Sequence, residues 1–220
     1  MAIKLIVTDM DGSLLDEKSQ FPPNFKEAYD LMKENGIIFT AASGRSPDGL
    51  YRLFGDLAKE MTFISDNGAR ILHKDELIFE EGLSFEDYGP FINEMRSHPD
   101  LFSVACGKEK KWVENADAVS ERARTEMRKF YPGWYETDFK NIPENVIRFA
   151  LLYFDDIEKN IYPFFKKYDN ERVCVQVVIN NGNNTFIAFA VFKLVFDMIF
   201  HTPIKTFLRG IIPAVSSAGH

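Results

Sequence analysis

Cysteine and long apolar runs are scarce in this chain of 220 residues. Its cysteines, Cys106 and Cys174, lie far apart and lack the spacing of a metal site, which speaks against a disulfide framework and against a zinc site. We expect two reduced thiols, as is typical of a cytoplasmic protein. The apolar segment 2–7 is too short for a secretory leader, so it also favours the cytoplasm.

Positively charged residues are also relatively few. Lysine and arginine number 26 against 33 acidic residues, giving a net charge of −7. This balance argues against a nucleic-acid or membrane-surface partner. The apolar segment 186–200 contains Lys193 and Asp197 and is too short and too charged for a membrane span. An acidic protein that handles phosphate must neutralise it locally, with a cation or with backbone N–H groups.

A short apolar run near the N-terminus ends in Asp9 and Asp11. Such a run, bounded by a turn signal, is typical of a buried parallel strand, and open α/β sheets bind ligands at the carboxyl ends of their strands. Side chains alternate along a strand, so the two aspartates should point the same way. Gly12 allows a turn and a close approach of backbone N–H groups to an anion. The alternative is an acidic loop after a strand.

A second apolar run, 37–42, predicts another buried strand and ends at Ser43. A helix should follow, with Pro47 at its first position. The Ser43 hydroxyl can donate to a phosphate oxygen beside the free N–H groups of that helix. Taken alone, Ser43 is better explained as a turn serine, but its spacing from the aspartate pair favours the phosphate-binding role. Arg45 fits a substrate clamp and a surface ion-pair partner equally well.

Strands and helices alternate over the first 65 residues, which predicts an α/β fold with a parallel, Rossmann-like sheet. A third strand, 62–65, leads into the turn signal Asn67-Gly68. A hairpin over 71–73 and 77–80 follows. From about residue 84 the pattern becomes a separate α+β alternation of roughly a hundred residues, enough for an inserted domain.

The segment from Asp9 to Leu14 resembles motif I of the haloacid dehalogenase superfamily of phosphatases, Asp-x-Asp-Gly-Thr-Leu. Ser13 stands where threonine is usual, and Ser43 matches the hydroxyl of motif II. The first 180 or so residues resemble the Cof-type sugar-phosphate phosphatase branch. That resemblance implies a Rossmann-like core with an inserted α+β cap that closes over the site.

The resemblance divides the chain into a core at 1–83 with motifs I and II, a cap at 84–181, and an atypical apolar tail at 182–220. The family's motif III lysine and its motif IV Gly-Asp-Gly-x-Asn-Asp are not found in the sequence. The core is therefore expected to be incomplete. Three readings stay open: the tail replaces the missing half, Lys193 and Asp197 stand in for the missing groups, or the tail is the unrelated sequence of a truncated or frame-shifted gene product.

The resemblance further implies Mg²⁺-dependent hydrolysis of a small phosphorylated metabolite, such as a sugar phosphate. Asp9 would be the nucleophile that forms an aspartyl-phosphate, Asp11 the general acid and base, and both would hold Mg²⁺. Asn67 would lie near the substrate entrance, although a turn asparagine with positive φ explains it as well. The residues expected to bind phosphate or substrate are Met10, Gly12, Ser43, Gly44, Arg45 and Asn67.

Losing the motif III and IV groups should leave charge uncompensated in the transition state, so we expect impaired activity. The alternative is a non-catalytic remnant that at most binds phosphate. A receiver-type phosphoacceptor domain also uses aspartates at strand ends, but the large insertion after the third strand argues against it.

Overall fold

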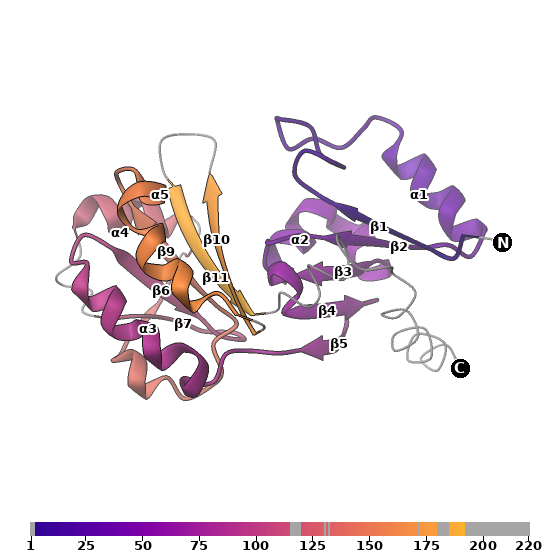
Figure 1. Cartoon of the computed structure of the whole chain (residues 1–220). Helices are drawn as coiled ribbons and strands as arrows, with labels where there is room; N and C mark the ends of the chain where they lie inside the picture. Colours follow the sequence, from indigo (N-terminus) through magenta and orange to yellow (C-terminus); the bar gives the residue numbers. More distant parts are fainter. Residues whose placement is uncertain are drawn as a thin grey trace. The chain divides into compact units, whose positions relative to one another are not determined.

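The structure is a computed structural model that describes residues 3–114, 120–129, 131, 133–170, 172–179 and 185–191. The chain divides into two units, of which the first runs to Glu80 and the second begins at Glu81. Each unit is built around one β-sheet (Figure 1). Within the described ranges, no helix combines the length and the apolar character needed to cross a membrane.

The first unit has a five-stranded sheet in the order β1-β2-β3-β4-β5. Strands β1, β2 and β3 are parallel, whereas β4 and β5 are antiparallel additions. In the described part of the chain, β1 pairs with β2 alone and is an edge strand. In chain order the elements are β1 (Leu5–Asp9), α1 (Phe25–Glu34), β2 (Ile38–Ala42), α2 (Pro47–Phe54), the 3₁₀ helix η1 (Gly55–Glu60), β3 (Thr62–Ser65), the 3₁₀ turn η2 (Asp66–Gly68), β4 (Arg70–His73) and β5 (Glu76–Glu80).

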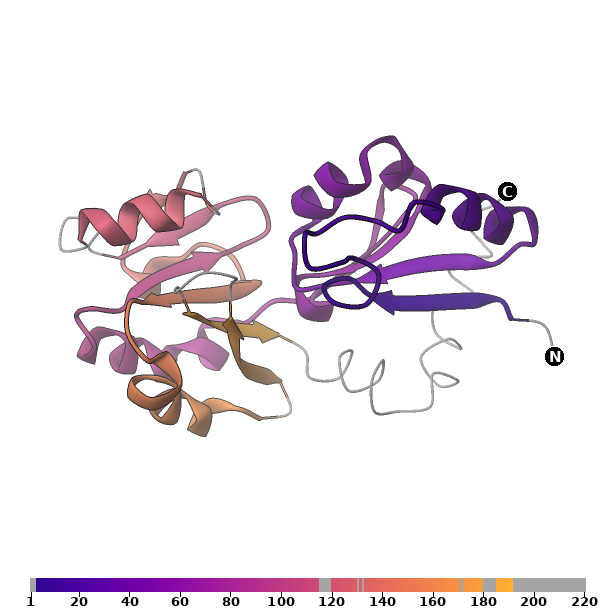
Figure 2. The same cartoon turned by 90° about the horizontal axis from the view of Figure 1, so that it is seen from above.

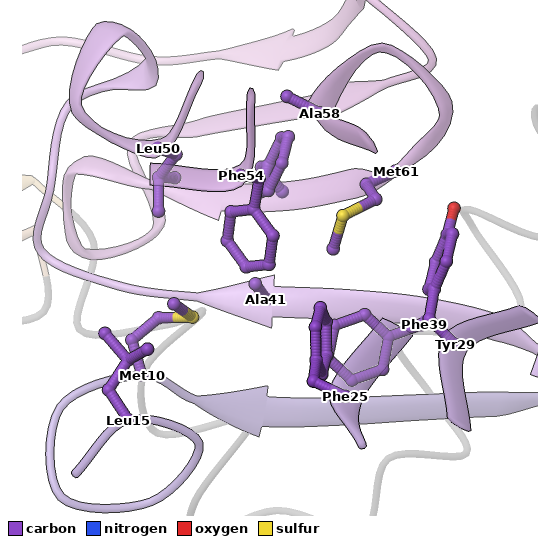
Figure 3. Close-up of a cluster of buried hydrophobic side chains, with 11 residues drawn as sticks. Met10, Leu15, Phe25, Tyr29, Phe39, Ala41, Leu50, Phe54, Ala58 and Met61 are labelled. Atoms are coloured by element: carbon purple, nitrogen blue, oxygen red, sulfur yellow. The ribbon is translucent and has the colours of Figure 1, made fainter. Parts of the chain in front are cut away.

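Helices α1 and α2 pack on the same face of this sheet, where aromatic side chains dominate the core. Phe25 of α1 and Phe54 of α2 have ring centroids 6.0 Å apart, and Phe63 of β3 lies 5.3 Å from Phe54. Pro47 occupies the first turn of α2, where its missing N–H costs no helical hydrogen bond. Figure 3 shows the core side chains Met10, Leu15, Phe25, Tyr29, Phe39, Ala41, Leu50, Phe54, Ala58 and Met61.

The second unit has a six-stranded sheet in the order β10-β11-β9-β6-β7-β8. All its pairings are antiparallel except β7 with β8. In chain order the elements are α3 (Phe85–Ser97), β6 (Phe102–Cys106), β7 (Lys111–Val113), α4 (Glu121–Arg128), β8 (Tyr135–Glu136), the 3₁₀ helix η4 (Phe139–Asn141), β9 (Arg148–Tyr153), α5 (Ile157–Asn160), α6 (Tyr162–Phe165), the 3₁₀ helix η5 (Lys166–Tyr168), β10 (Val173–Ile179) and β11 (Thr185–Val191).

Helices cover both faces of the second sheet (Figure 2). On one face, the ring of Phe149 in β9 lies 5.7 Å from the ring of Phe91 in α3. On the other face, the next residue, Ala150, belongs to a buried cluster with Ala123 and Met127 of α4. Because neighbouring strand residues point to opposite faces, one strand serves both layers.

The α/β fold predicted from the sequence is confirmed, and so is the hairpin of β4 and β5. The expected boundary before residue 182 differs from the structure. Strand β11 lies between β10 and β9, so the second sheet continues beyond that boundary to Val191. The remaining predictions for the tail, including the roles of Lys193 and Asp197, fall on residues outside the described ranges.

Candidate functional site

The turn after β1 fixes the directions of the two aspartates. Met10 is fully buried and Leu15 is 2% exposed, and both side chains belong to the core (Figure 3). The N–H of Leu15 donates to the carbonyl of Met10 at 2.8 Å, and Gly12 turns the chain with φ +79°. Met10 points into the core, whereas Asp9, the last residue of β1, is half-buried and the Asp11 side chain in the turn is 60% exposed.

The carboxylate of Asp9 sits in a half-buried place at the end of β1. Burial raises its pKa, a hydrogen bond from the backbone N–H of Met10 opposes that shift, and the negative charge of Asp11 raises the pKa further. The two carboxylates therefore lie near enough to repel each other. A cation placed between them would relieve that repulsion.

Arg45 already supplies a positive charge to Asp11. Its Nη2 donates to Asp11 Oδ1 at 2.7 Å, and its Nε lies 3.4 Å from Asp11 Oδ2. The Asp11 side chain is 60% exposed, so this pair stabilises the fold by about 0–1 kcal/mol. Because the pair is weak, Arg45 can leave Asp11 for a bound anion without unfolding the site.

Ser43 follows β2 directly, beside the end of β1, because Ala42 is the register partner of Asp9. The Ser43 side chain is buried, and its Oγ accepts from the backbone N–H of Arg45 at 3.2 Å. A hydroxyl that accepts in this way still has its own hydrogen to donate. Ser43 therefore offers the donor that a phosphate oxygen needs.

A left-handed turn after β3 ties the third strand end to this segment. Asp66 has φ +50° and Asn67 has φ +57°. The N–H of Asp66 donates to the carbonyl of Arg45 at 2.9 Å, and the N–H of Asn67 donates to the carbonyl of Ser43 at 3.1 Å. The turn interpretation of Asn67 is thus confirmed, whereas its contact with substrate stays a prediction.

Six of the eight predicted site residues form one connected group at the carboxyl ends of β1, β2 and β3: Asp9, Asp11, Ser43, Gly44, Arg45 and Asn67. The side chain of Met10 is not in this group, since it points into the core. The backbone N–H of Gly12 donates to Leu15 at 3.2 Å. Only main-chain atoms of Met10 are left for the phosphate-binding role predicted for it.

Three charged residues near the site had no role in the sequence-based prediction. Arg70 of β4 is buried, with its Nε 3.1 Å from Glu80 Oε2 and its Nη1 3.7 Å from Asp66 Oδ2. This buried cluster holds the turn that carries Asn67. The signal available in the sequence was Asp66 itself, an acidic residue directly after a buried strand.

The side chain of Asn67 leaves little room for a Cβ at Gly44. A Cβ on Gly44 would lie 2.7 Å from Asn67 Oδ1. We predict that Gly44→Ala lowers the free energy of unfolding by about 1 kcal/mol, near the low end for overpacking because the amide can rotate away. Urea denaturation measures this, and the loss should disappear when Asn67 is changed to glycine in the same chain.

Gly49, the third residue of α2, is the matched control for this substitution. A Cβ there would meet its nearest neighbours at an ordinary 3.6 Å. Gly49→Ala should therefore stabilise the protein by up to about 1 kcal/mol through helix propensity. Equal effects of the two substitutions would contradict the proposed contact between Gly44 and Asn67.

The residues present fit a magnesium ion only partly. No group of three histidine, cysteine or acidic side chains that could hold a metal occurs among the described residues. Mg²⁺ is often held by one or two carboxylates, with water and substrate phosphate completing its octahedron. Asp9 and Asp11 supply that minimum.

The family model described as haloacid dehalogenase-like hydrolase matches residues 6–190. The chain is 28% identical over 192 residues to the 5-amino-6-(5-phospho-D-ribitylamino)uracil phosphatase YbjI of Escherichia coli (strain K12), covering 84% of this chain and 67% of that protein. It is 25% identical over 150 residues to the phosphatase YwtE of Bacillus subtilis (strain 168), which carries the same substrate in its name, covering 58% and 51%.

Among solved structures, the fold is similar to that of SMU.1108c from Streptococcus mutans UA159. The TM-score is 0.74 at 23% identity, over 94% of this chain and 76% of that one. At this identity the likeness concerns the fold alone. The matched part of the chain spans 67% and 51% of the lengths of the two curated relatives.

Proposed function

The chain belongs to the haloacid dehalogenase-like hydrolases, and from this we propose that it is a Mg²⁺-dependent phosphatase of small phosphorylated metabolites. The observation that carries the proposal is the pair Asp9 and Asp11 at the end of β1, beside Ser43 and Arg45 at the end of β2. Two relatives named as phosphatases of a phosphorylated ribitylaminouracil support a small phosphomonoester as substrate. We further propose a cytoplasmic location, with neither nucleic acid nor membrane as a partner.

Asp9 and Asp11 would hold the magnesium ion. When bound, Mg²⁺ supplies Lewis-acid polarisation of the phosphoryl group and offsets its negative charge. Because no third histidine, cysteine or acidic side chain joins these two in the described part of the chain, we expect weak binding of the ion. The repulsion that raises the pKa of Asp9 favours any cation that approaches both side chains.

The chain's own residues would carry the proton and phosphoryl transfers. A carboxylate oxygen of Asp9 attacks phosphorus and forms an aspartyl-phosphate, while the bond to the leaving oxygen breaks and that oxygen takes a proton from Asp11. Water then attacks the phosphorus and gives its proton to Asp11, which regenerates the Asp9 carboxylate and releases phosphate. The Ser43 hydroxyl and the guanidinium of Arg45 hold the phosphoryl oxygens.

The competing proposal is a non-catalytic remnant that binds phosphate without turnover. Release of inorganic phosphate from a panel of sugar phosphates and phosphorylated ribitylamines, with Mg²⁺ and with a chelator, separates the two. We expect slow release that depends on Mg²⁺. Release that is equal with and without the ion, and equal to a protein-free blank, would favour the remnant.

Arg45 should act on substrate binding. We predict that Arg45→Gln lowers kcat/KM about 10- to 100-fold, mainly through a higher KM, because a bidentate contact to phosphate is lost. Arg45→Lys keeps the positive charge but loses the planar, two-pronged guanidinium. Its kcat/KM should therefore lie between that of the unchanged chain and that of Arg45→Gln. Steady-state kinetics measure both. A KM that is unchanged in Arg45→Gln would show that Arg45 serves only as the ion-pair partner of Asp11.

A further inference from the structure

A cavity lies at the end of the first sheet opposite to Asp9 and Asp11. It has a volume of about 520 Å³ and is lined by Ile38, at the start of β2, and by Thr62, at the start of β3. Asp9 pairs with Ala42 at the far end of β2, so β2 separates this cavity from the aspartates along its whole length. The volume lies in the range of pockets that bind small molecules.

Positive side chains predominate around this cavity. Lys33, Lys59 and Lys74 line it, against one carboxylate, Glu60. Lys33 is paired with Glu60, whereas neither Lys59 nor Lys74 has an ion-pair partner among the described residues. Two unneutralised lysines at one cavity stand out in a chain whose net charge is −7. Such a local excess attracts anions.

His73 adds a buried polar group to the wall. It is 8% exposed, and its Nδ1 lies 2.7 Å from the hydroxyl oxygen of Thr62. Burial and the charge of Lys74 lower its pKa, against a smaller opposing effect of the carboxylate of Glu76 on the neighbouring strand, and this keeps the ring neutral at neutral pH. When the Thr62 hydroxyl donates to Nδ1, the hydrogen of the ring is on Nε2, which is then a donor.

The remaining wall is apolar and aromatic. Tyr29 and Phe39 line the cavity, and their rings meet edge to face with centroids 6.1 Å apart. The cavity thus combines a cationic rim, one neutral buried histidine and a rigid aromatic wall. This is the usual composition of a site for a small ligand that carries both charge and an organic body.

We propose that this cavity binds a small organic anion, either a phosphate ester or a polycarboxylate, at a site separate from Asp9 and Asp11. The lysines supply the charge, and the aromatic wall contacts the body of the ligand. His73 supplies a directed donor at Nε2 in the tautomer whose Nδ1 accepts from Thr62. The inference does not depend on catalytic activity, because it concerns the opposite end of the strands.

The test is an NMR titration of the full chain labelled with ¹⁵N-histidine, in the presence of a chelator. The His73 ring signal is assigned by its loss in His73→Gln. Citrate and inorganic pyrophosphate are added separately, and we expect a saturable shift of the His73 signal with at least one of them. Which probe acts tells a carboxylate ligand from a phosphate ligand.

Charge variants make the test specific. Removing two charges with Lys59→Gln and Lys74→Gln together should weaken binding about 10-fold or more. The matched control is Lys18→Gln with Lys166→Gln, two exposed lysines that do not line the cavity, and it should bind as the unchanged chain does. Absence of a saturable His73 shift with both probes, or equal weakening in the two double variants, would overturn the proposal.

Discussion

Asp9→Asn is expected to reduce Mg²⁺-dependent phosphate release by at least about 10³-fold in kcat/KM, the usual order for loss of a catalytic group that acts as a unit with its neighbours. The amide keeps the shape of the carboxylate but cannot attack phosphorus or donate its charge to a metal ion. Colorimetric phosphate release, with substrate in excess and Mg²⁺ present, measures the loss.

Asp16→Asn is the control on the same segment. Asp16 accepts backbone hydrogen bonds at 2.8 Å from Lys18 and Gln20, which an asparagine oxygen can also accept, so activity should be unchanged.

The same substitution should not unfold the protein, and this separates lost chemistry from lost structure. Burial and the charge of Asp11 raise the pKa of Asp9 above its ordinary value of 3.8, so ionised Asp9 opposes folding. Protonated Asp9 contributes stability to the fold. This contribution is fully present below pH 3.8 and is lost as the pH rises through the raised pKa of Asp9 in the folded protein. In metal-free buffer, Asp9→Asn should therefore be more stable than the unchanged chain at neutral pH, with the difference vanishing in acid. An inactive variant that is also less stable at neutral pH would contradict this account.

Strand ends were the part of the site that the sequence predicted well. The apolar runs before Asp9 and Ser43 identify two parallel strands, which bring their carboxyl ends to one edge. The burial expected for both is found in most of β2, whereas β1 is half-buried along its whole length because it lies at the edge of the described sheet. Local signals of this kind depend only on neighbours in the chain. Pro47 at the start of α2 is another, because its fixed φ and missing N–H suit one helical position.

Contacts across long stretches of sequence were not predictable in the same way. Arg45 pairs with Asp11 across 34 residues, and composition could not distinguish this partner from any other acidic residue. The approach of Asn67 to Gly44 likewise depends on how two turns meet. Each arrangement is decided by the packing of the sheet, which a single sequence does not specify residue by residue.

Strand β11 shows how a compositional break can mislead. The segment 185–191 is apolar without the alternation of a half-buried strand, so it reads as the start of an unusual tail. In the structure it has a partner on each side, β10 and β9. Backbone pairing with two neighbouring strands, which composition does not reveal, makes this segment part of the second sheet.

Phe63→Ala should produce the largest loss of stability in the first unit, about 3–5 kcal/mol in the free energy of unfolding. The ring is fully buried in β3 and packs against Phe54, at 5.3 Å, and Tyr51, at 5.7 Å between centroids. Its removal takes apolar surface from the core and leaves a cavity between the sheet and α2. Hydrogen exchange of the full chain, read peptide by peptide, measures the loss in β3 and its neighbours.

The functional consequence follows from what β3 carries at its end. In the turn after β3, the backbone N–H of Asp66 donates to the carbonyl of Arg45. The N–H of Asn67 donates to the carbonyl of Ser43. Faster exchange should therefore extend from β3 into the segment that holds Ser43 and Arg45, and any phosphate release should fall at a lower temperature than in the unchanged chain. Leu77→Ala, at a 39% exposed position of β5, is the control and should cost less than about 1 kcal/mol. If both variants behave alike, the aromatic core is not what positions the ends of β2 and β3.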